Sequence, residues 1–520
     1  MTPYLLAIDN GSQSTKVTIF DSRGHALVSA SRPLKPYDIS VPGHAVHPGD
    51  DIWDSISCAC RDAMTRFRAD PADIAAVGLC TIRFCRALLK SGGSLAEPVL
   101  SWMDERVARP YQATNPVTRY VTTSSGYITH RLTGQFVDTA ANYEGVWPID
   151  HDTATWSTEP ACYTATGMPR DMLFDLVPPG GRLGQVTETA AEATGIPIGL
   201  PVYATANDKA VEALGSGLAD DGTVLLSLGT YIAAMTIGSS STSADGSYWA
   251  NFAARPGKYL YESTGIRRGM WLVSWYRTLL DGQNDPAGLQ DALNAEASGL
   301  APGSNGLLTL PDWLAPGDAT WRRGALLGFD GSQGRAHIYR SILEGIALTM
   351  ANHTAAMEKA LGRRLAPVLV SGGGSRSDLM MQIVADVFDR PARRAAVSGA
   401  AGLGAAICAA VGHGIYPDWD QATAAMVGAA DEFSPDPRAA RAYHQINKMY
   451  ATLTTFTDPL FRSVADGLQG LPRSCNDAVA AARRTTGLCG GGRGRCRQAG
   501  RWSSSASSGP PKAGSASTRS

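Results

Sequence analysis

Residues 5–27 have the sequence LLAIDNGSQSTKVTIFDSRGHAL, in which two short apolar segments flank a polar turn that contains a glycine. Leu5–Ile8 and Val17–Phe20 have the length and composition of buried strands, and the turn between them runs from Asp9 to Thr15. The segment therefore predicts a β-hairpin. Its turn could present backbone N–H groups and hydroxyls to a phosphate, while Asp9 at the strand end could hold a metal ion.

A second strand–turn–strand pattern occurs at residues 223–238, TVLLSLGTYIAAMTIG, with Gly229 and Thr230 in its turn. The two hairpins share little sequence, so the repeat concerns architecture only. Each turn alone is also explained by ordinary hairpin geometry. The first turn is not a P-loop, because the GxxxxGK[ST] pattern is absent. Together, two such turns facing each other across a cleft could hold one polyphosphate from both sides.

Strand and helix patterns alternate along most of the chain, which is typical of an α/β fold. The helix pattern at residues 401–412 is rich in Ala and Gly, so we expect that helix to pack closely against its neighbours. Short apolar runs predict strands at residues 74–80 and 202–205, and periodic apolar residues predict helices at residues 51–67, 124–132, 268–280, 337–361, 378–388, 401–412 and 438–455.

The composition is that of a globular protein with more than one domain. The chain has 520 residues, of which 44% are hydrophobic and 18% charged, and it contains no apolar run long enough for a membrane span. The N-terminus lacks the basic lead-in of a signal peptide, and the nine cysteines include no CxxC pair. We therefore expect a soluble protein of the reducing cytoplasm, with no membrane partner.

The net charge of −1 hides an asymmetry, because eight Lys and Arg residues and no acidic residue follow Asp477. The rest of the chain is therefore acidic, which makes it a poor non-specific binder of nucleic acid. From about residue 464 the apolar periodicity fades and Arg, Gly and Ser dominate, so we expect disorder there. A basic arm for nucleic acid or an acidic partner, and an out-of-frame translation of GC-rich coding sequence, are the alternatives for this tail.

A carboxylate follows the strand predicted at residues 202–205, in the sequence Asn207-Asp208-Lys209. In α/β proteins, ligands bind in the crevice beyond the carboxyl ends of strands, so Asp208 could deprotonate a substrate hydroxyl there. Alternatively, this segment only caps a helix at residues 209–214.

A glycine-rich loop with the sequence SGGGSRSD, Ser371–Asp378, follows a short apolar strand and precedes a helix. Gly372 and Gly373 would let the backbone approach a flat ligand, and the helix N-terminus supplies free N–H groups. A flexible strand-to-helix loop, with Ser377 or Asp378 as the N-cap, is the alternative.

The segment Ser101–Arg106, SWMDER, has side chains that suit a sugar. Trp102 could stack on the apolar face of a sugar ring, and Asp104 could accept hydrogen bonds from its hydroxyls. Arg83, after the strand predicted at residues 74–80, could also bind a polar substrate. The structural alternatives are a surface helix start for SWMDER and an ion pair with a nearby acid for Arg83.

Taken in order, these segments resemble the FGGY carbohydrate kinases, the group that contains glycerol kinase, xylulokinase and ribulokinase. The resemblance covers about residues 4–455 and rests on eight motifs, among them IDNGSQSTK, SWMDER, ATANDKAVEALGSG, LSLGTY and VSGGGSRSDLMMQIVADV. It implies two domains of the actin-like ATPase fold, each with a ribonuclease-H-like core, and ATP bound in the interdomain cleft. Bacterial members of unassigned substrate are the most similar ones.

The resemblance also implies roles for individual residues. Asp208 matches the family's general base, and Asp9 lies where the family holds Mg²⁺. The other matches are residues that touch the sugar or polyol, and residues of the phosphate turns and the adenosine loop. The first set is Arg83, Trp102 and Asp208, and the second is Gly11, Ser14, Thr15, Gly229, Thr230, Gly372, Gly373 and Ser377. Asp104 is predicted to contact the substrate from the SWMDER segment itself.

The sequence favours an ATP-dependent kinase of a small polyol, pentulose or other ketose. The segment GLCTIRFC, residues 78–85, lacks the Met-His pair associated with xylulokinases and the Gln-Arg-Glu associated with glycerol kinases, so the acceptor is not assigned. A non-catalytic nucleotide-binding regulator on the same fold is the alternative. We expect an N-terminal domain at residues 1–216, a C-terminal domain at residues 217–462 and a tail at residues 463–520, with a homodimer as one candidate assembly.

Overall fold

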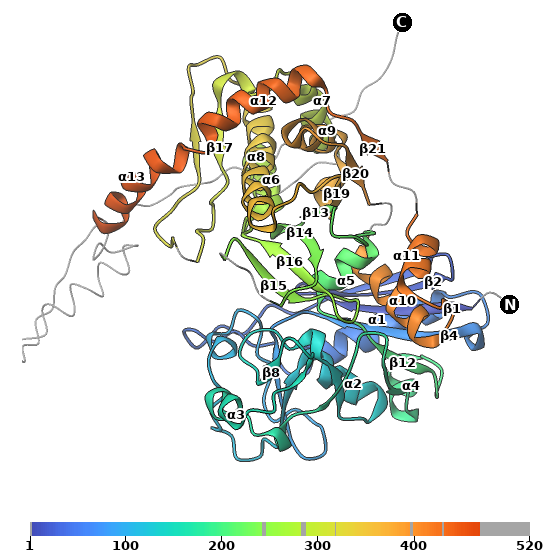
Figure 1. The fold of residues 1–520 in the computed structure, drawn as a ribbon. Helices are drawn as coiled ribbons and strands as arrows, with labels where there is room; N and C mark the ends of the chain where they lie inside the picture. The colour runs from blue at the N-terminus through green and yellow to red at the C-terminus, as the bar shows by residue number, and fades with distance from the viewer. Residues whose placement is uncertain are drawn as a thin grey trace, which may run out of the picture. The chain divides into compact units, whose positions relative to one another are not determined.

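The computed structural model describes residues 3–241, 246–281, 288–317, 319–395, 399–428 and 431–467 (Figure 1). Within the chain, Met1–Arg462 forms one compact unit that is built around two large mixed sheets. The tail predicted to be disordered lies, apart from its first five residues, outside the described residues.

The first sheet has six strands in the spatial order β11-β12-β4-β1-β2-β3. β1, β2 and β3 form an antiparallel meander, and β4 and β12 continue the sheet in parallel on the other side of β1. The opening hairpin is confirmed, and its pairing extends to Asn10 opposite Thr15, so the turn is shorter than predicted. The strands are β1 (Tyr4–Asn10), β2 (Ser14–Asp21), β3 (Ala26–Pro33), β4 (Ile74–Thr81), β11 (Arg182–Gln185) and β12 (Pro201–Ala204).

The second sheet has seven strands in the order β15-β16-β14-β13-β19-β20-β21. In it, β16, β14 and β13 form an antiparallel meander, and β19 and β20 continue in parallel from β13. This repeats the arrangement of the first sheet and confirms the predicted α/β class with two ribonuclease-H-like cores. The strands are β13 (Val224–Leu228), β14 (Ile232–Gly238), β15 (Tyr248–Phe252), β16 (Tyr259–Ser263), β19 (Val368–Ser371), β20 (Ala392–Arg394) and β21 (Glu432–Phe433).

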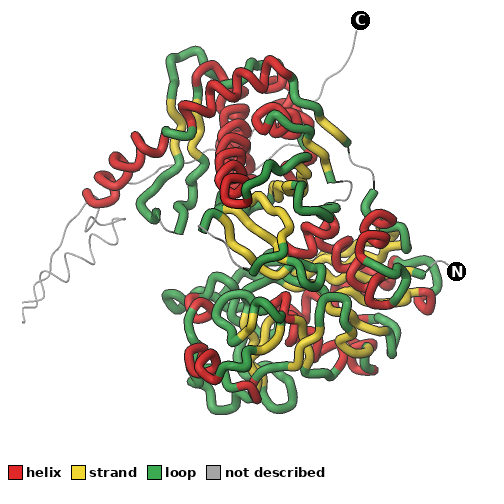
Figure 2. Tube along the Cα trace, viewed as in Figure 1, coloured by secondary structure: helices red, strands yellow, loops and turns green. Residues whose placement is uncertain are grey.

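Short strands form four further pairs, and loops make up much of the region between β5 and β12 (Figure 2). The pairs are β5 (Arg86–Leu89) with β6 (Tyr120–Thr123), β7 (Val137–Thr139) with β10 (Asp175–Val177), β8 (Ile149–Asp150) with β9 (Thr155–Trp156), and β17 (Leu308–Leu310) with β18 (Ala325–Leu327).

The helices predicted from apolar periodicity are present, with one correction. The helix predicted at residues 438–455 ends at Tyr450, and a separate helix begins at Leu453 and continues to Gly467, inside the segment assigned to the tail. The helices are α1 (Asp51–Arg66), α2 (Ser124–Thr133), α3 (Pro160–Thr166), α4 (Glu188–Thr194), α5 (Asp208–Gly215), α6 (Gly269–Asp281), α7 (Leu289–Ser298), α8 (Arg335–Leu361), α9 (Asp378–Phe388), α10 (Ala400–His413), α11 (Trp419–Met426), α12 (Pro437–Tyr450) and α13 (Leu453–Gly467).

The small-residue helix α10 packs against α5, β1 and β4, although it comes late in the chain (Figure 1). A Cβ added to Gly404 would lie 2.0 Å from the carbonyl oxygen of Val211, and one added to Gly215 would lie 1.9 Å from that of Ala400. The two backbones can approach this closely only because glycine has no Cβ. The predicted close packing is confirmed, and α10 joins the first sheet from beyond the domain division proposed at residue 216.

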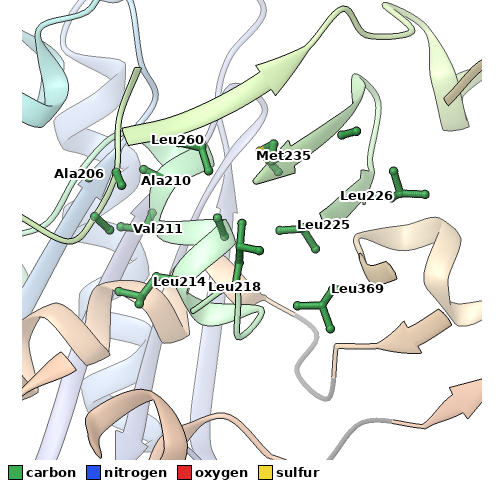
Figure 3. Packing of buried hydrophobic residues seen from close by; sticks show 14 of the residues in the cluster. Ala206, Ala210, Val211, Leu214, Leu218, Leu225, Leu226, Met235, Leu260 and Leu369 are labelled. Atoms are coloured by element: carbon green, nitrogen blue, oxygen red, sulfur yellow. The ribbon is translucent and has the colours of Figure 1, made fainter. Parts of the chain in front are cut away.

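Apolar side chains of α5 pack with those of the second sheet (Figure 3). The cluster fixes α5, and with it the residue at its N-terminus, relative to β13 and β16. Its members include Ala206, Ala210, Val211, Leu214, Leu218, Leu225, Leu226, Met235, Leu260 and Leu369.

Candidate active site

Asp208 is the first residue of α5, just after the end of β12. The helix cap is provided by Asn207, whose Oδ1 accepts a hydrogen bond from the N–H of Ala210 at 3.0 Å. Asp208 Oδ1 accepts a bond from the N–H of Lys209 at 3.0 Å, and the side chain of Asp208 remains 28% exposed. The capping function therefore falls to Asn207, and the Asp208 carboxylate is accessible to a ligand.

The surroundings of Asp208 raise its pKa. Burial is the main cause and Glu212 adds to it, whereas Arg83 and Lys209 lower the pKa. Arg83 Nε lies 3.7 Å from Asp208 Oδ1. A carboxyl group with a raised pKa is a stronger base, which suits the removal of a proton from a hydroxyl.

Arg83 is held on several sides. Its two terminal nitrogens donate to both carboxylate oxygens of Glu262, at 2.9 and 3.0 Å. Its guanidinium carbon lies 5.4 Å from the ring centroid of Phe84 and 5.3 Å from that of Trp249, and these two rings stack at 5.7 Å. The ion pair considered for Arg83 is present, and a contact of Arg83 with substrate stays a prediction.

Two of these neighbours, Trp249 and Glu262, come from the hairpin of β15 and β16, where they are directly opposed. Opposed residues of a β-pair project from the same face, so both side chains reach Arg83 together. Sequence reasoning missed them, because neither belongs to a recognised motif. The one available signal was an acidic residue inside the otherwise apolar strand YLYES.

A further buried carboxyl group, that of Glu144, is coupled to this cluster. Its Oε1 accepts a hydrogen bond from the N–H of Phe252 at 2.8 Å, and its Oε2 is buried without a hydrogen-bond partner among the described residues. Burial raises the pKa of Glu144 to about 8, the Phe252 N–H and Arg83 oppose this rise, and Glu262 adds to it. Burial therefore favours the protonated, uncharged form of Glu144.

A cavity of about 470 Å³ is reached by Glu212, which follows Asp208 by one turn of α5. Burial, together with the nearby carboxylates of Asp208 and Glu212, raises the pKa of Asp9 to about 7, although Lys16 lowers it. The cavity is lined by Asp9, Lys16, Glu212, Ser371, Gly372, Gly373, Ser375, Arg376, Arg394, Ala395, Gly399, Ala400 and Ala401.

The second hairpin turn and the glycine-rich loop lie at the same edge of the second sheet, because β13 and β19 are parallel neighbours. Gly372 has a φ of +84°, and a Cβ there would lie 2.6 Å from the carbonyl oxygen of Leu228. A glycine is required at this position, since any other residue would be strained and would collide with the adjacent strand. This close approach is made to the end of β13, and the approach of Gly372 and Gly373 to a flat ligand stays a prediction.

Comparison with known proteins agrees with this arrangement. The N-terminal domain of the FGGY family of carbohydrate kinases matches residues 4–118 and 111–215, and the C-terminal domain of the same family matches residues 224–413. The chain belongs to the FGGY family of carbohydrate kinases.

Individual relatives of this FGGY kinase are similar over nearly their whole length. The uncharacterized sugar kinase YgcE of Escherichia coli K12 is 46% identical over 474 residues, which are 90% of this chain and 96% of that protein. The xylulose kinase structure from Rhodospirillum rubrum covers 88% of this chain and 100% of its own, with 25% identity and a TM-score of 0.76. The gluconate kinase structure from Lactobacillus acidophilus covers 89% of this chain and 100% of its own, with 19% identity and a TM-score of 0.79.

The protein is therefore a carbohydrate kinase with a small-molecule sugar substrate, and kinases of this family use ATP as the phosphate donor. None of the helices in the described part of the chain combines the length and apolar character that a membrane crossing needs. Within the same ranges, no three His, Cys, Asp or Glu residues are grouped so that they could hold a metal ion by themselves.

The turn of the first hairpin, which is predicted to bind phosphate, is held by hydrogen bonds within this FGGY kinase. The N–H of Gly11 donates to the carbonyl oxygen of Ser14 at 3.1 Å. The hydroxyl of Thr15 is buried and lies 2.8 Å from Asn10 Nδ2 and 2.6 Å from Ser55 Oγ. Thr15 thus shapes the turn from inside, and the phosphate contacts predicted for these residues stay a prediction.

The second turn and the predicted adenosine loop are anchored to helices. The carbonyl oxygens of Gly229 and Thr230 accept hydrogen bonds from the start of α6, at 3.1 and 2.7 Å. Ser377 caps α9 by accepting from the N–H of Met380, and its hydroxyl donates to Asn294 Oδ1 at 2.9 Å. Ser377 therefore acts as the N-cap of α9, as the structural alternative predicts. Gly372 and Gly373 line the cavity.

The two residues of the SWMDER segment that are predicted to contact a sugar differ in their exposure to solvent. Trp102 is 45% exposed and offers an accessible aromatic face. Asp104 is buried, and its oxygens accept hydrogen bonds from the N–H of Ala45 and from both the backbone and the guanidinium of Arg106. Asp104 therefore holds this loop in place, and a sugar contact by its side chain has no support from these hydrogen bonds.

Proposed function

We propose that this kinase transfers the γ-phosphoryl group of ATP to a hydroxyl of a small polyol or ketose, with Asp208 as the general base. The observation that carries the proposal is the position of α5. Asp208 at its start lies beside Arg83, and Glu212 one turn later lines the cavity that also contains Asp9 and Gly372. One short helix thus connects the acceptor side of the site with the phosphate side.

In the proposed reaction, Asp208 accepts the proton of the acceptor hydroxyl while the hydroxyl oxygen forms a bond to the γ-phosphorus. The bond from that phosphorus to the bridging oxygen of ADP breaks at the same time. Asp208 later releases its proton to solvent. The raised pKa of Asp208 favours this proton transfer, and the neighbouring Arg83 orients the carboxylate.

The cavity lined by Asp9 and Glu212 suits a polyphosphate bound together with Mg²⁺. Mg²⁺ in kinases is held by one or two carboxylates plus phosphate oxygens, and Asp9 provides such a carboxylate. Burial is the main cause of the raised pKa of Asp9, and the charges of Asp208 and Glu212 add to it; a divalent cation would offset these like charges. When bound, the Mg²⁺–ATP complex supplies the transferable phosphoryl group and neutralises its charge.

The substitution Asp208→Asn tests the proposal. We expect the rate of acceptor-dependent ADP formation to fall by about 10²–10⁴-fold, while the affinity for ATP, measured by titration calorimetry, changes little. Asp175→Asn is the matched control, because Asp175 pairs with Arg170 on the surface. An Asp208→Asn enzyme that retains more than about a tenth of the wild-type rate would exclude Asp208 as the base.

A non-catalytic nucleotide-binding regulator on the same fold is not favoured by any contact described above. Such a protein would have no use for a base beside an acceptor site, whereas Asp9 and Asp208 are both present and coupled to each other. Absence of ADP formation with every sugar and polyol offered would revive this alternative.

A further inference from the structure

If the proposed function holds, the contacts of Arg83 indicate whether the acceptor is charged or neutral. Two cations lower the pKa of Asp208, and both already have a carboxylate partner. Arg83 forms the bidentate pair with Glu262, and Lys209 Nζ lies 2.8 Å from Glu212 Oε2. A sugar acid is recognised best through two parallel N–H groups of an arginine, and here Glu262 occupies them.

Carboxyl groups surround the same point. Asp208 lies on one side of Arg83 and Glu262 on the other, and the side chain of Glu262 is only 4% exposed. A carboxylate on the acceptor would enter next to these two negative charges, while both terminal nitrogens of Arg83 are already bonded to Glu262. Juxtaposed like charges at low solvent exposure oppose binding strongly, so this arrangement acts against an anionic acceptor.

The rest of the cluster suits an uncharged, hydroxylated molecule. Trp249 is 38% exposed, so part of its ring can pack against the C–H groups of a sugar, as aromatic rings do in sugar sites. Its stacking partner Phe84 adopts a φ of +63°, a backbone conformation that is rare for a residue with a bulky side chain. The local structure thus bears a conformational cost to keep this aromatic pair against Arg83.

We propose that the acceptor of this kinase is an uncharged alditol or ketose rather than a sugar acid, and that Glu262 sets this preference by occupying the guanidinium of Arg83. The fold by itself does not decide the matter, because the gluconate kinase of Lactobacillus acidophilus shares it. The deciding feature is the bidentate pair, which joins the loop after β4 to β16.

The first experiment compares matched acceptors with the wild-type enzyme. Xylitol and xylonate, ribitol and ribonate, and mannitol and mannonate each differ only in a terminal CH₂OH or carboxylate group, and xylulose and ribulose represent the ketoses. We expect measurable kcat/KM for at least one neutral compound and at least about tenfold less for its acid partner. Faster turnover of the acids would overturn the inference and leave the kinase assignment intact.

The second experiment frees Arg83 by the substitution Glu262→Gln. We expect the ratio of kcat/KM for the acid to that for the neutral partner to rise about tenfold or more, since the guanidinium can then pair with an acceptor carboxylate. Asp458→Asn is the matched control, because Asp458 forms a bidentate pair with Arg322 outside the site. That variant should keep the wild-type ratio.

Each further outcome is decisive as well. An unchanged ratio in a folded Glu262→Gln enzyme would overturn the role of Glu262. Should that variant fail to fold, as shown by circular dichroism, the wild-type comparison alone still decides between neutral and acidic acceptors. No ADP formation with any compound of either series would overturn the proposed function itself, and this inference with it.

Discussion

Ser227 and Ser371 donate hydrogen bonds to the same atom, Oε1 of Glu212, at 2.7 Å each. The two serines are register partners on the parallel strands β13 and β19. Ser227 stands shortly before the Gly229-Thr230 turn, and Ser371 stands directly before the glycine-rich loop. Lys209 Nζ contacts the other oxygen of Glu212 and Ser227 Oγ, both at 2.8 Å. A single carboxylate thus ties the helix that begins with Asp208 to both strands.

Replacing Glu212 by Gln should loosen this connection. The amide keeps the shape of the side chain but removes the negative charge that is hydrogen-bonded to the largely buried ammonium group of Lys209. We expect the free energy of unfolding, measured in urea, to fall by about 3 kcal/mol. We also expect KM for ATP to rise more than KM for the acceptor, because the two strand ends at the phosphate side lose their common anchor.

The double variant Glu212→Gln with Lys209→Met is the control for that experiment. It removes both charges, so the loss of stability should be smaller than in the single variant. Equal stability of wild type and Glu212→Gln would show that the network contributes nothing to the fold.

The raised pKa of Asp9 predicts that the stability of the folded protein depends on pH. The pKa of Asp9 is raised from 3.8 to about 7 in the folded protein, mainly by burial, so the folded state holds a proton in this pH window that the unfolded chain has lost. The contribution of this group to stability therefore falls as the pH rises from about 4 to about 7. Asp9→Asn removes the effect. We expect the variant to have a higher Tm than wild type at pH 8 without nucleotide, and a similar Tm at pH 4.

The same variant separates stability from function. Asn is a poor Mg²⁺ ligand in comparison with a carboxylate, so the more stable Asp9→Asn protein should lose Mg²⁺-dependent turnover. A Tm difference that does not change between pH 4 and pH 8 would contradict the shifted pKa. Undiminished magnesium dependence would show that Asp9 is a turn residue only.

The crossing of α5 and α10 predicts opposite effects for two glycines of one helix. A Cβ at Gly404 would lie 2.0 Å from the carbonyl oxygen of Val211, whereas one at Gly402 would only approach the ring of Phe20 at 3.8 Å. Gly404→Ala should therefore destabilise the protein by about 1–3 kcal/mol, as overpacking does. Gly402→Ala should be neutral or stabilise it by up to about 1 kcal/mol, because alanine favours the helix.

Thermal and urea unfolding of the two variants measure this contrast under identical conditions. Similar stabilities for Gly402→Ala and Gly404→Ala would mean that α5 and α10 do not cross at the distance described. Activity is a second readout for Gly404→Ala, because a displaced α5 would move Asp208 as well.

Several elements of the site were predictable from short stretches of sequence. The two hairpins, the strand before Asp208 and the loop at Gly372 follow from apolar runs that end in polar or glycine residues, and such signals depend only on neighbours in the chain. The cap at Asn207 and the helix after it were also visible, although sequence alone could not separate the function of Asn207 from that of Asp208.

Side-chain direction could not be predicted in this way. The hydroxyl of Thr15 is bonded to Ser55 on α1, and the carboxylate of Asp104 is bonded to the backbone of Ala45, while the ligand contacts predicted for both residues stay predictions. In both cases the partner lies far away in the sequence, so no local pattern reveals it.

The amino-acid sequence by itself determined the α/β elements, the repeated hairpins and the position of a carboxylate at the end of β12, since each depends on local periodicity and turn chemistry. Only the tertiary structure decided that α10 returns to the first sheet, and that Glu262 and Trp249 of the second sheet contact Arg83. These contacts depend on strand register and on helix packing between distant segments. Such features come from the burial of side chains in three dimensions and leave no period in the sequence.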